Sequence, residues 1–362
     1  MSPAEVGGGS GAGFRGGFRG GSGAGSAPET RGGSGTAVIP RGESRAPGVI
    51  RDPEQRLASE QRLTSGLSID LGEWRALEAA HQERADALTA AHRERRHRGE
   101  QHPIEDFLFT YYPFKPAELR KWHPGAGVAL ADAVDRASWR YYATDPTSAA
   151  IVDVAAFFAK RAQTVDYVEQ LLAATLEHTP QFGCFGLHEW AMVYRLTPDE
   201  LRHTRLPLRI GHEATDAVVE SHQIGCSHFD AYRFFTPAAE PLNRLSPTRE
   251  NQPAMEQSGC LHAGMDIYKW VTKLGPIVPG ELLLDAFEFA RDIRFVDMQA
   301  SPYDVSGYVD AAGVPLEPIA IETPAGKQEY VRRQRAFAAR GNLLRVRVLE
   351  AIAAARAALV TA

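Results

Sequence analysis

The chain has 362 residues, enough for one enzyme-sized domain and a tail, and its formal net charge of −5 gives no overall attraction to nucleic acid. Neither a transmembrane helix nor a secretory signal is recognisable, so we expect a cytoplasmic protein without membrane partners. The three cysteines, Cys184, Cys226 and Cys260, form no CxxC pair, which argues against a disulfide framework and a cysteine-based zinc site.

Residues 1–69 are predicted to be a disordered tail and linker. Up to about residue 36 the tail is dominated by Gly, with almost no large aliphatic residues, so it cannot bury enough apolar surface to offset chain entropy. Its FRGGFRGG segment resembles Arg-Gly segments that bind single-stranded nucleic acid. A flexible leader, or an extension from a mis-chosen start codon, is the simpler interpretation.

Residues 70–362 are predicted to form one mainly helical catalytic domain. An amphipathic helix with a basic end begins near Asp70. The proline-broken, aromatic segment 102–125 indicates short helices joined by tight turns, and residues 147–178 indicate one or two helices. A capping box in LTPDELRH, formed by Thr197 and Glu200, predicts another helix start.

The second half continues the helical pattern. β-Branched and aromatic runs on either side of Gly225 favour a small β-hairpin within residues 215–235. Helices are then predicted at about 254–274, 280–299 and 324–360. Strands and helices do not alternate, so a parallel α/β sheet is not expected and the predicted class is mainly α with a possible hairpin.

Four polar residues share one face of the segment CLHAGMDIYKWVTKLGP. In a helix, His262, Asp266, Lys269 and Lys273 lie within about 60° of one another, as a narrow stripe. The rest of the circumference is mostly apolar, which predicts a helix packed on two sides. The stripe therefore faces either solvent, as a salt-bridged surface, or a polar cavity that holds a reaction site.

The next predicted helix carries three carboxylates, Asp285, Glu288 and Asp292, at one edge of its apolar face. Because they repel each other, they need Arg or Lys partners, raised pKa values or a bound cation. If this helix lies against the preceding one, Lys269 and Lys273 are the predicted partners. A structural ion-pair network is then the simpler interpretation.

Two further clusters place a histidine near a carboxylate among aromatic residues. Neighbouring helical residues point in different directions, so His188 and Glu189 are not expected to bind one ligand together. His228 and Asp230 would share a face only in a strand. Established phosphate-loop, zinc-protease, serine-hydrolase and zinc-deaminase motifs are absent.

Five segments together resemble a known family: HPIEDFLFTYYPF, CFGLHEWAMVYR, CSHFDAYRFFTP, CLHAGMDIYKWVTKL and ARDIRFVDMQASPYD. In content and order, over about residues 70–350, they are similar to an actinobacterial family usually labelled 3-methyladenine DNA glycosylase. The resemblance implies hydrolysis of the N-glycosidic bond of alkylated purines in DNA repair. The chain lacks a helix-hairpin-helix loop with its catalytic Asp and the zinc pattern of type I glycosylases, so no catalytic residue is transferred.

Base excision requires a carboxylate at the sugar, aromatic rings that stack the extruded base, and cations for the phosphates. Asp266 or Glu189 is the predicted carboxylate. Lys269 and His262 complete the predicted catalytic set, and the basic C-terminal helix supplies the DNA contacts without a cofactor. The predicted stacking residues are Tyr111, Tyr112, Trp190, Tyr194, Tyr268 and Trp270.

Two alternatives stay open. One is a metal-dependent oxidoreductase or hydrolase that acts on a small molecule, with Fe or another divalent metal bound between facing helices, as in di-iron proteins. Its predicted ligands are His262, Asp266, His228, Glu288 and Asp292. The other is a non-enzymatic nucleic-acid binding protein, which fits less well with so many partly buried carboxylates.

Overall fold

The computed structural model describes residues 67–201 and 206–361. This part of the chain is mainly helical with one small four-stranded sheet, which confirms the predicted fold class. Apart from its last three residues, the predicted tail and linker lies outside the described residues. Within the described ranges, every helix is too short or too polar to cross a membrane.

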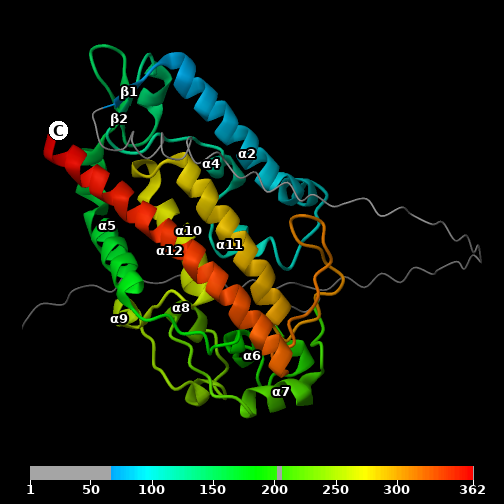
Figure 1. Ribbon diagram of the computed structural model, residues 1–362. Coiled ribbons are helices and arrows are strands. Elements are labelled where there is room, and N and C mark those ends of the chain that lie inside the picture. Colours follow the sequence, from blue (N-terminus) through cyan, green and yellow to red (C-terminus); the bar gives the residue numbers. More distant parts are fainter. Residues whose placement is uncertain (1–66, 202–205, 362) are drawn as a thin grey trace, which may run out of the picture. The chain divides into compact units, whose positions relative to one another are not determined.

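Four helices form the centre of the fold (Figure 1). They are α5 (Val154–Glu177), α10 (Leu261–Leu274), α11 (Gly280–Ala300) and α12 (Pro324–Thr361). Helix α10 packs mainly against α11, and α12 packs across α5, α10 and α11. The predicted helices in these regions are therefore confirmed, because each carries a continuous apolar face that finds a partner.

Helix α10 approaches α11 closely at Gly264. A Cβ at this position would lie 2.7 Å from Cδ1 of Ile293, so the missing side chain brings the two backbones together. The helix ends at Gly275, whose φ of 55° suits a residue without a Cβ, and a short 3₁₀ turn (Gly275–Ile277) leads into α11. This close packing against α11 helps to bury most of the surface of α10.

The N-terminal part combines a long helix with the sheet. Helix α2 (Leu71–His97) begins at Asp70, whose side chain accepts a hydrogen bond from the Glu73 backbone N–H at 2.9 Å, as predicted for a helix start there. The sheet has the order β1-β2-β4-β3, with β1 parallel to β2 and the other pairs antiparallel. Its strands are β1 (Leu67–Ile69), β2 (Val128–Leu130), β3 (Tyr142–Thr144) and β4 (Ala150–Val152). The predicted domain boundary at residue 70 thus leaves out β1.

Short helices fill the connections, as predicted for residues 102–125. They are α3 (Phe107–Thr110), α4 (Pro116–Leu119), η2 (Val134–Ser138), α6 (Leu187–Ala191), η3 (Pro198–Glu200), η4 (Glu240–Leu242) and α9 (Gln252–Met255). The capping box of Thr197 and Glu200 forms, but it begins only the 3₁₀ turn η3 before residues 202–205, which lie outside the described part.

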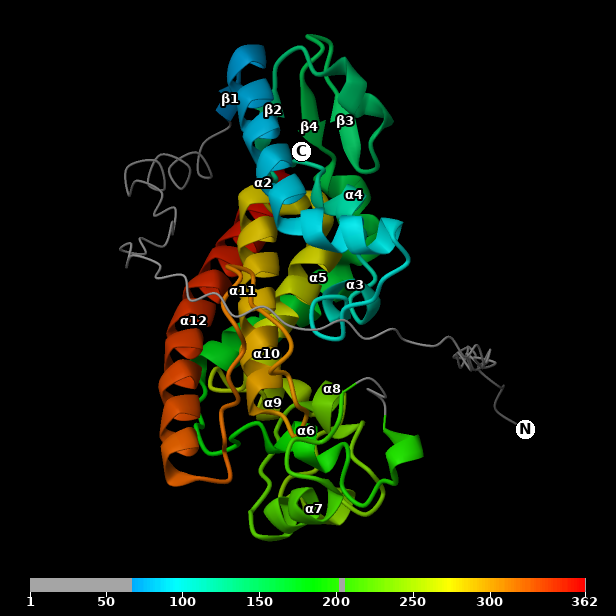
Figure 2. The same ribbon diagram turned by 90° about the vertical axis from the view of Figure 1, so that its right-hand side faces the viewer.

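The predicted β-hairpin at residues 215–235 is wrong. This region forms α7 (His212–Glu220) and α8 (Phe229–Tyr232), and the hairpin of the fold is β3–β4 instead. A short run of β-branched residues is compatible with either structure, and here Val218 and Val219 of α7 are buried. Helix α2 and the sheet lie at one end of the α10–α11 pair, and α6 and α7 lie at the other (Figure 2).

Candidate metal centre

The polar stripe of α10 runs from the interior to solvent. Asp266 is 1% exposed, and His262 and Lys269 are partly buried, whereas Lys273 is exposed. The interpretation of the stripe as an exposed salt-bridged surface is therefore wrong for the first three residues. The predicted packing of α10 on two sides is confirmed, since α11 and α12 both cover it.

Arginines from α2 and α12 neutralise the acidic edge of α11. Arg84 lies 2.8 Å from both Asp285 and Glu288, and Arg347 lies 2.7 Å from Asp285. This edge is therefore a structural ion-pair network that ties α2, α11 and α12 together.

The partners of this network differ from the prediction. Asp292 pairs with Arg340 of α12 at 2.5 Å, while Lys269 bonds Asp230 and Asp266 instead of the acidic edge. The predicted pairing with α10 is wrong because the acidic edge of α11 faces α2 and α12. The sequence shows which residues share one face of a helix, but it does not show which neighbouring helix that face contacts.

We expect Asp285→Asn to destabilise the protein by about 2 kcal/mol, between the values for exposed and buried ion pairs, because its side chain is 26% exposed. Burial alone would raise the pKa of Asp285, but Arg347 and Arg84 outweigh it and hold the pKa below its usual value. The ionised Asp285 carboxylate therefore makes its full contribution to the free energy of unfolding above about pH 4, the pKa of an aspartate in the unfolded chain. This contribution is lost as the pH falls through the lower pKa of Asp285 in the folded protein.

Urea unfolding of Asp285→Asn and the parent chain between pH 7 and pH 2 measures this contribution. Asp166→Asn is the matched control, because it removes a 61% exposed partner of Arg356. An equal loss in both variants at pH 7, or a loss that does not decrease as the pH falls below about 4, contradicts the prediction.

Two groups of histidines and carboxylates adjoin each other beside α10. The Asp297 group consists of His188, Glu189, His262 and Asp297, and the Asp266 group consists of His228, Asp230 and Asp266. Within each group the potential ligand atoms all lie within 4.8 Å of one another. The ring of His262 connects them, with its centre 4.3 Å from that of His188 and 5.7 Å from that of His228.

Three helices build the Asp297 group. α6 contributes His188 and Glu189, the first turn of α10 contributes His262, and the last turns of α11 contribute Asp297. Helix α6 starts after Gly186, whose φ of 71° turns the chain inward just before the two site residues. His188 Nε2 donates a hydrogen bond to Asp297 Oδ1 at 3.1 Å.

The structure brings together the neighbouring residues of both clusters, which the sequence did not lead us to expect. His188 and Glu189 are both buried and reach the same group, because it lies between two side chains separated by about 100°. His228 and Asp230 meet without a strand, since His228 has extended backbone at the N-cap of α8 and Asp230 lies in the first turn.

The two carboxylates of the Asp297 group are held by Arg294 and His188. Arg294 Nη1 donates to Glu189 Oε1 at 3.2 Å and to Asp297 Oδ2 at 3.1 Å, and its guanidinium lies 4.2 Å from the Phe107 ring centre. Two carboxylates thus share one guanidinium. Burial raises the pKa of Asp297, but His188 and Arg294 outweigh it and keep the pKa below its usual value, so the carboxylate is ionised.

His262 supplies a neutral imidazole with a free nitrogen. Burial, with the neighbouring His188 and His228, holds the pKa of His262 well below its usual value. Its Nδ1 is shielded from solvent and has no hydrogen-bond partner among the described residues. Neutral imidazole is the form that binds a metal ion, so this group has free ligand capacity.

In the Asp266 group, by contrast, the central carboxylate is surrounded by donors. Tyr112 donates to Asp266 Oδ1 at 3.0 Å, Lys269 Nζ donates to Oδ2, and His228 Nε2 lies 3.5 Å from Oδ2. Lys269 Nζ also lies 2.8 Å from Asp230 Oδ2. Burial alone would lower the pKa of Lys269, but these two carboxylates raise it above its usual value, so the ammonium stays charged.

His228 is a second charged partner in this group. Its Nδ1 donates to Glu256 Oε2 at 3.1 Å, while its Nε2 faces Asp266. Burial lowers the pKa of His228, but Glu256 and Asp266 outweigh it and raise the pKa above its usual value. The matching effect lowers the pKa of Glu256 despite its burial. His228 is thus an imidazolium held between two carboxylates.

The charges of the Asp266 group therefore balance. Its three carboxylates, with Glu256 included, face His228, Lys269 and also Arg233, whose Nε lies 3.1 Å from Asp230 Oδ1. The charged members of this network are all ion-paired, so it has no excess charge for a further cation to balance, although His228 Nε2 and Asp230 Oδ1 have no hydrogen-bond partner within the described residues. The two adjoining groups thus differ in what they can still bind.

The predicted stacking residues lie mainly in the core. Trp190 and Tyr268 are fully buried, and Tyr111 is partly exposed, with its ring centre 4.9 Å from that of Phe107. The remaining three, Tyr112, Tyr194 and Trp270, are buried as well. Buried rings can accept a base only after the core opens, so in this conformation they serve packing.

Most of the basic residues of α12 are paired within the protein. Arg332 and Arg333 both contact Glu329, at 2.7 and 2.6 Å. Arg345 is buried and donates to the Ala263 carbonyl at 3.1 Å. With Arg340 and Arg347 bound to α11, four arginines of the predicted DNA-contacting patch contact carboxylates of the protein itself.

The metal-ligand set predicted from the sequence is divided in the structure. His262 belongs to the Asp297 group, and His228 and Asp266 belong to the adjoining group. Glu288 and Asp292 bind arginines at the acidic edge. The predicted set therefore combines members of three separate environments.

Three important residues were missed: Asp297, Arg294 and Glu256. Within IRFVDM, Arg294 and Asp297 are three residues apart and the other residues are apolar, which is a sequence signal for a buried ion pair. Glu256 lies in a loop and carries no periodic signal. Its role depends on contact with His228, 28 residues earlier in the chain.

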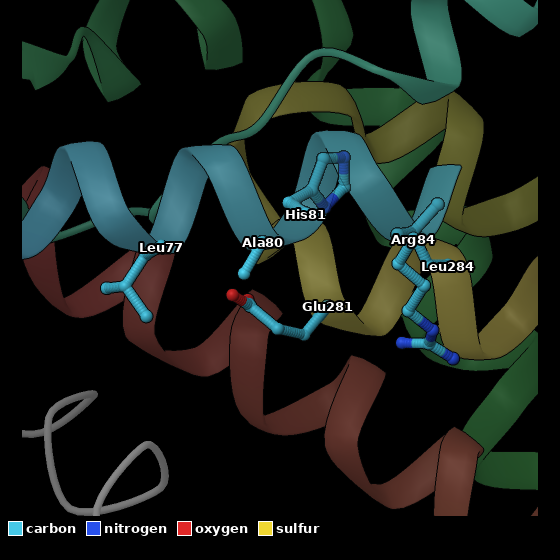
Figure 3. Close-up of a pocket in the computed structure, with 6 residues that line it drawn as sticks. All are labelled: Leu77, Ala80, His81, Arg84, Glu281 and Leu284. Atoms are coloured by element: carbon cyan, nitrogen blue, oxygen red, sulfur yellow. The ribbon is translucent and has the colours of Figure 1, made fainter. Parts of the chain in front are cut away.

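A small cavity lies away from both groups, between α2 and α11 (Figure 3). It has a volume of about 40 Å³, which is room for water and not for a substrate. Its lining residues are Leu77, Ala80, His81, Arg84, Glu281 and Leu284. Like His262, His81 has a shielded Nδ1 without a partner among the described residues, but it belongs to no ligand group there.

Comparison with known proteins adds no relative. No family model matches the chain, and no curated protein or solved structure matches it. The resemblance to the family labelled 3-methyladenine DNA glycosylase therefore stays a prediction based on five sequence segments. The geometry and charge of the two adjoining groups are the observations on which a functional assignment rests.

Proposed function

We propose that this chain is a metal-dependent enzyme whose centre is the Asp297 group. One observation carries the proposal: four potential ligands lie within 4.8 Å of one another, and His262 among them has a shielded nitrogen without a partner in the described residues. Two imidazoles and two carboxylates are a suitable ligand set for Fe(II), Mn(II) or Zn(II).

The contacts of the two carboxylates support the same assignment. Glu189 and Asp297 share Arg294, so one guanidinium holds both of them. Arg294 also orients both carboxylates, the role that outer partners of metal ligands commonly have. His262 is the partly exposed member of the group, so a substrate would approach from its side.

A metal ion at this position would polarise a substrate oxygen or lower the pKa of a bound water. Such chemistry fits the alternative of a hydrolase or oxidoreductase for a small molecule. Base excision from DNA stays a prediction. It receives less support because five of its six stacking residues are buried and the arginines of α12 are mostly paired.

Metal analysis of protein purified without chelator tests the proposal. We expect about one equivalent of Fe, Mn or Zn per chain, lost on dialysis against a chelator and recovered on adding the metal. Clearly substoichiometric content, together with no uptake of any of these ions by the folded chain, contradicts the proposed function.

A further inference from the structure

We propose that Lys269 is a built-in cation that occupies the metal position of the Asp266 group, so that the metal centre of this chain is mononuclear. The statement that the metal centre is mononuclear rests on the proposed function. The statement that Lys269 occupies the Asp266 group does not, because it concerns only that neighbouring group.

The two groups adjoin closely enough to raise the question of a second metal. His262 contacts His188 on one side and His228 on the other, with ring centres 4.3 and 5.7 Å apart. Each group offers histidine and carboxylate ligand atoms within 4.8 Å of one another. Carboxylate and histidine ligands on facing helices are also how two-metal sites are built.

Lys269 stands where the second metal would bind. Its Nζ bonds Oδ2 of Asp266 and lies 2.8 Å from Oδ2 of Asp230. His228 Nε2 lies 3.5 Å from the same Asp266 oxygen. An ammonium that bonds both carboxylates uses the oxygen atoms a metal would need, and two cations cannot share them without strong repulsion.

The surroundings hold the ammonium in this position. Its Nζ lies 4.3 Å from the ring centre of Trp270, and its side chain is 16% exposed. Arg233 and Arg249 approach the outer oxygen of Asp230, at 3.1 and 3.8 Å. Positive charge therefore covers Asp230 from both sides, which makes this group unfavourable for a divalent ion while Lys269 is present.

Replacing Lys269 should therefore create a metal site. We expect Lys269→Ala to bind about one more equivalent of Co²⁺ than the parent chain, with new visible absorption from the added ion. Lys269→Arg, which keeps the cation, should bind the parent number. Adding His228→Ala to Lys269→Ala should remove the extra ion. Lys273→Ala, on the same face of α10 but exposed, is the matched control.

The test separates this inference from the proposed function. If the parent chain binds no metal, the proposed function fails. An increase from no bound Co²⁺ ion in the parent to one in Lys269→Ala would still support the inference that Lys269 occupies the metal position of the Asp266 group. A folded Lys269→Ala chain with an unchanged metal number overturns the inference, as does a parent chain that already binds two ions. Loss of two buried charge partners threatens folding, so Lys269→Gln, which retains hydrogen bonding, is measured alongside. A Co²⁺-dependent rise in melting temperature that exceeds the rise of the parent chain in either variant supports the inference, and a rise no larger than that of the parent in both contradicts it.

Discussion

His262→Ala is expected to weaken metal binding at the Asp297 group by at least about 100-fold. Loss of an outer partner of a metal ligand costs 10–100-fold, and loss of a ligand costs more. His262 is the ligand whose Nδ1 has no other partner among the described residues, so its removal breaks no hydrogen bond of the fold there. Titration with Mn²⁺ or Zn²⁺ measures the affinity.

His81→Ala is the matched control for this experiment. His81 is buried and also has a shielded Nδ1 without a partner among the described residues, but it lies at the small cavity between α2 and α11 (Figure 3). Its replacement should leave the metal affinity unchanged. Equal weakening by both substitutions would show a general effect of unfolding, and no weakening by His262→Ala would remove His262 from the ligand set.

Arg136→Met is expected to lower the free energy of unfolding by about 3–5 kcal/mol, the range for breaking a buried ion pair. Its side chain is fully buried, bonds Glu78 and donates to the Trp122 carbonyl at 2.9 Å. The guanidinium also lies 3.8 Å from the ring centre of Trp139. Methionine fills similar space without charge, so the buried Glu78 loses this partner.

Arg75→Met provides the comparison, because Arg75 pairs with the same Glu78 carboxylate at 2.9 Å but is 46% exposed. An exposed pair contributes only about 0–1 kcal/mol. Urea unfolding of both variants at neutral pH measures the difference. Similar losses for the two arginines would mean that burial does not set the strength of this pair.

Local sequence patterns predicted much of the fold. The apolar spacing of residues 254–274, 280–299 and 324–360 predicted α10, α11 and α12. A helical period can be recognised from residues only a few positions apart, so it needs no knowledge of the tertiary structure. Asp70 was placed correctly at the start of α2 for the same reason. The hairpin failed because five or six β-branched and aromatic residues fit a buried helix and a strand equally well.

The same pattern predicted part of the site. A charged stripe on an otherwise apolar helix indicated that His262, Asp266 and Lys269 are unusual, and the structure places all three in or beside the two groups. Glu189 was also named, although its neighbour His188 was not expected to join it. Both residues reach His262 and Asp297, which lie on other helices. The periodicity of one helix does not show which residues of other helices it will contact.

The sequence by itself determined a mainly helical chain with polar groups on α10, because helix formation and amphipathicity depend on residues three or four positions apart. Only the tertiary structure decided which carboxylates those groups meet. Asp297 joins His188 across 109 residues, and Arg84 joins Glu288 across 204. Such partners are chosen by how helices pack, and this choice separates the Asp297 group, with free ligand capacity, from the balanced charges around Lys269.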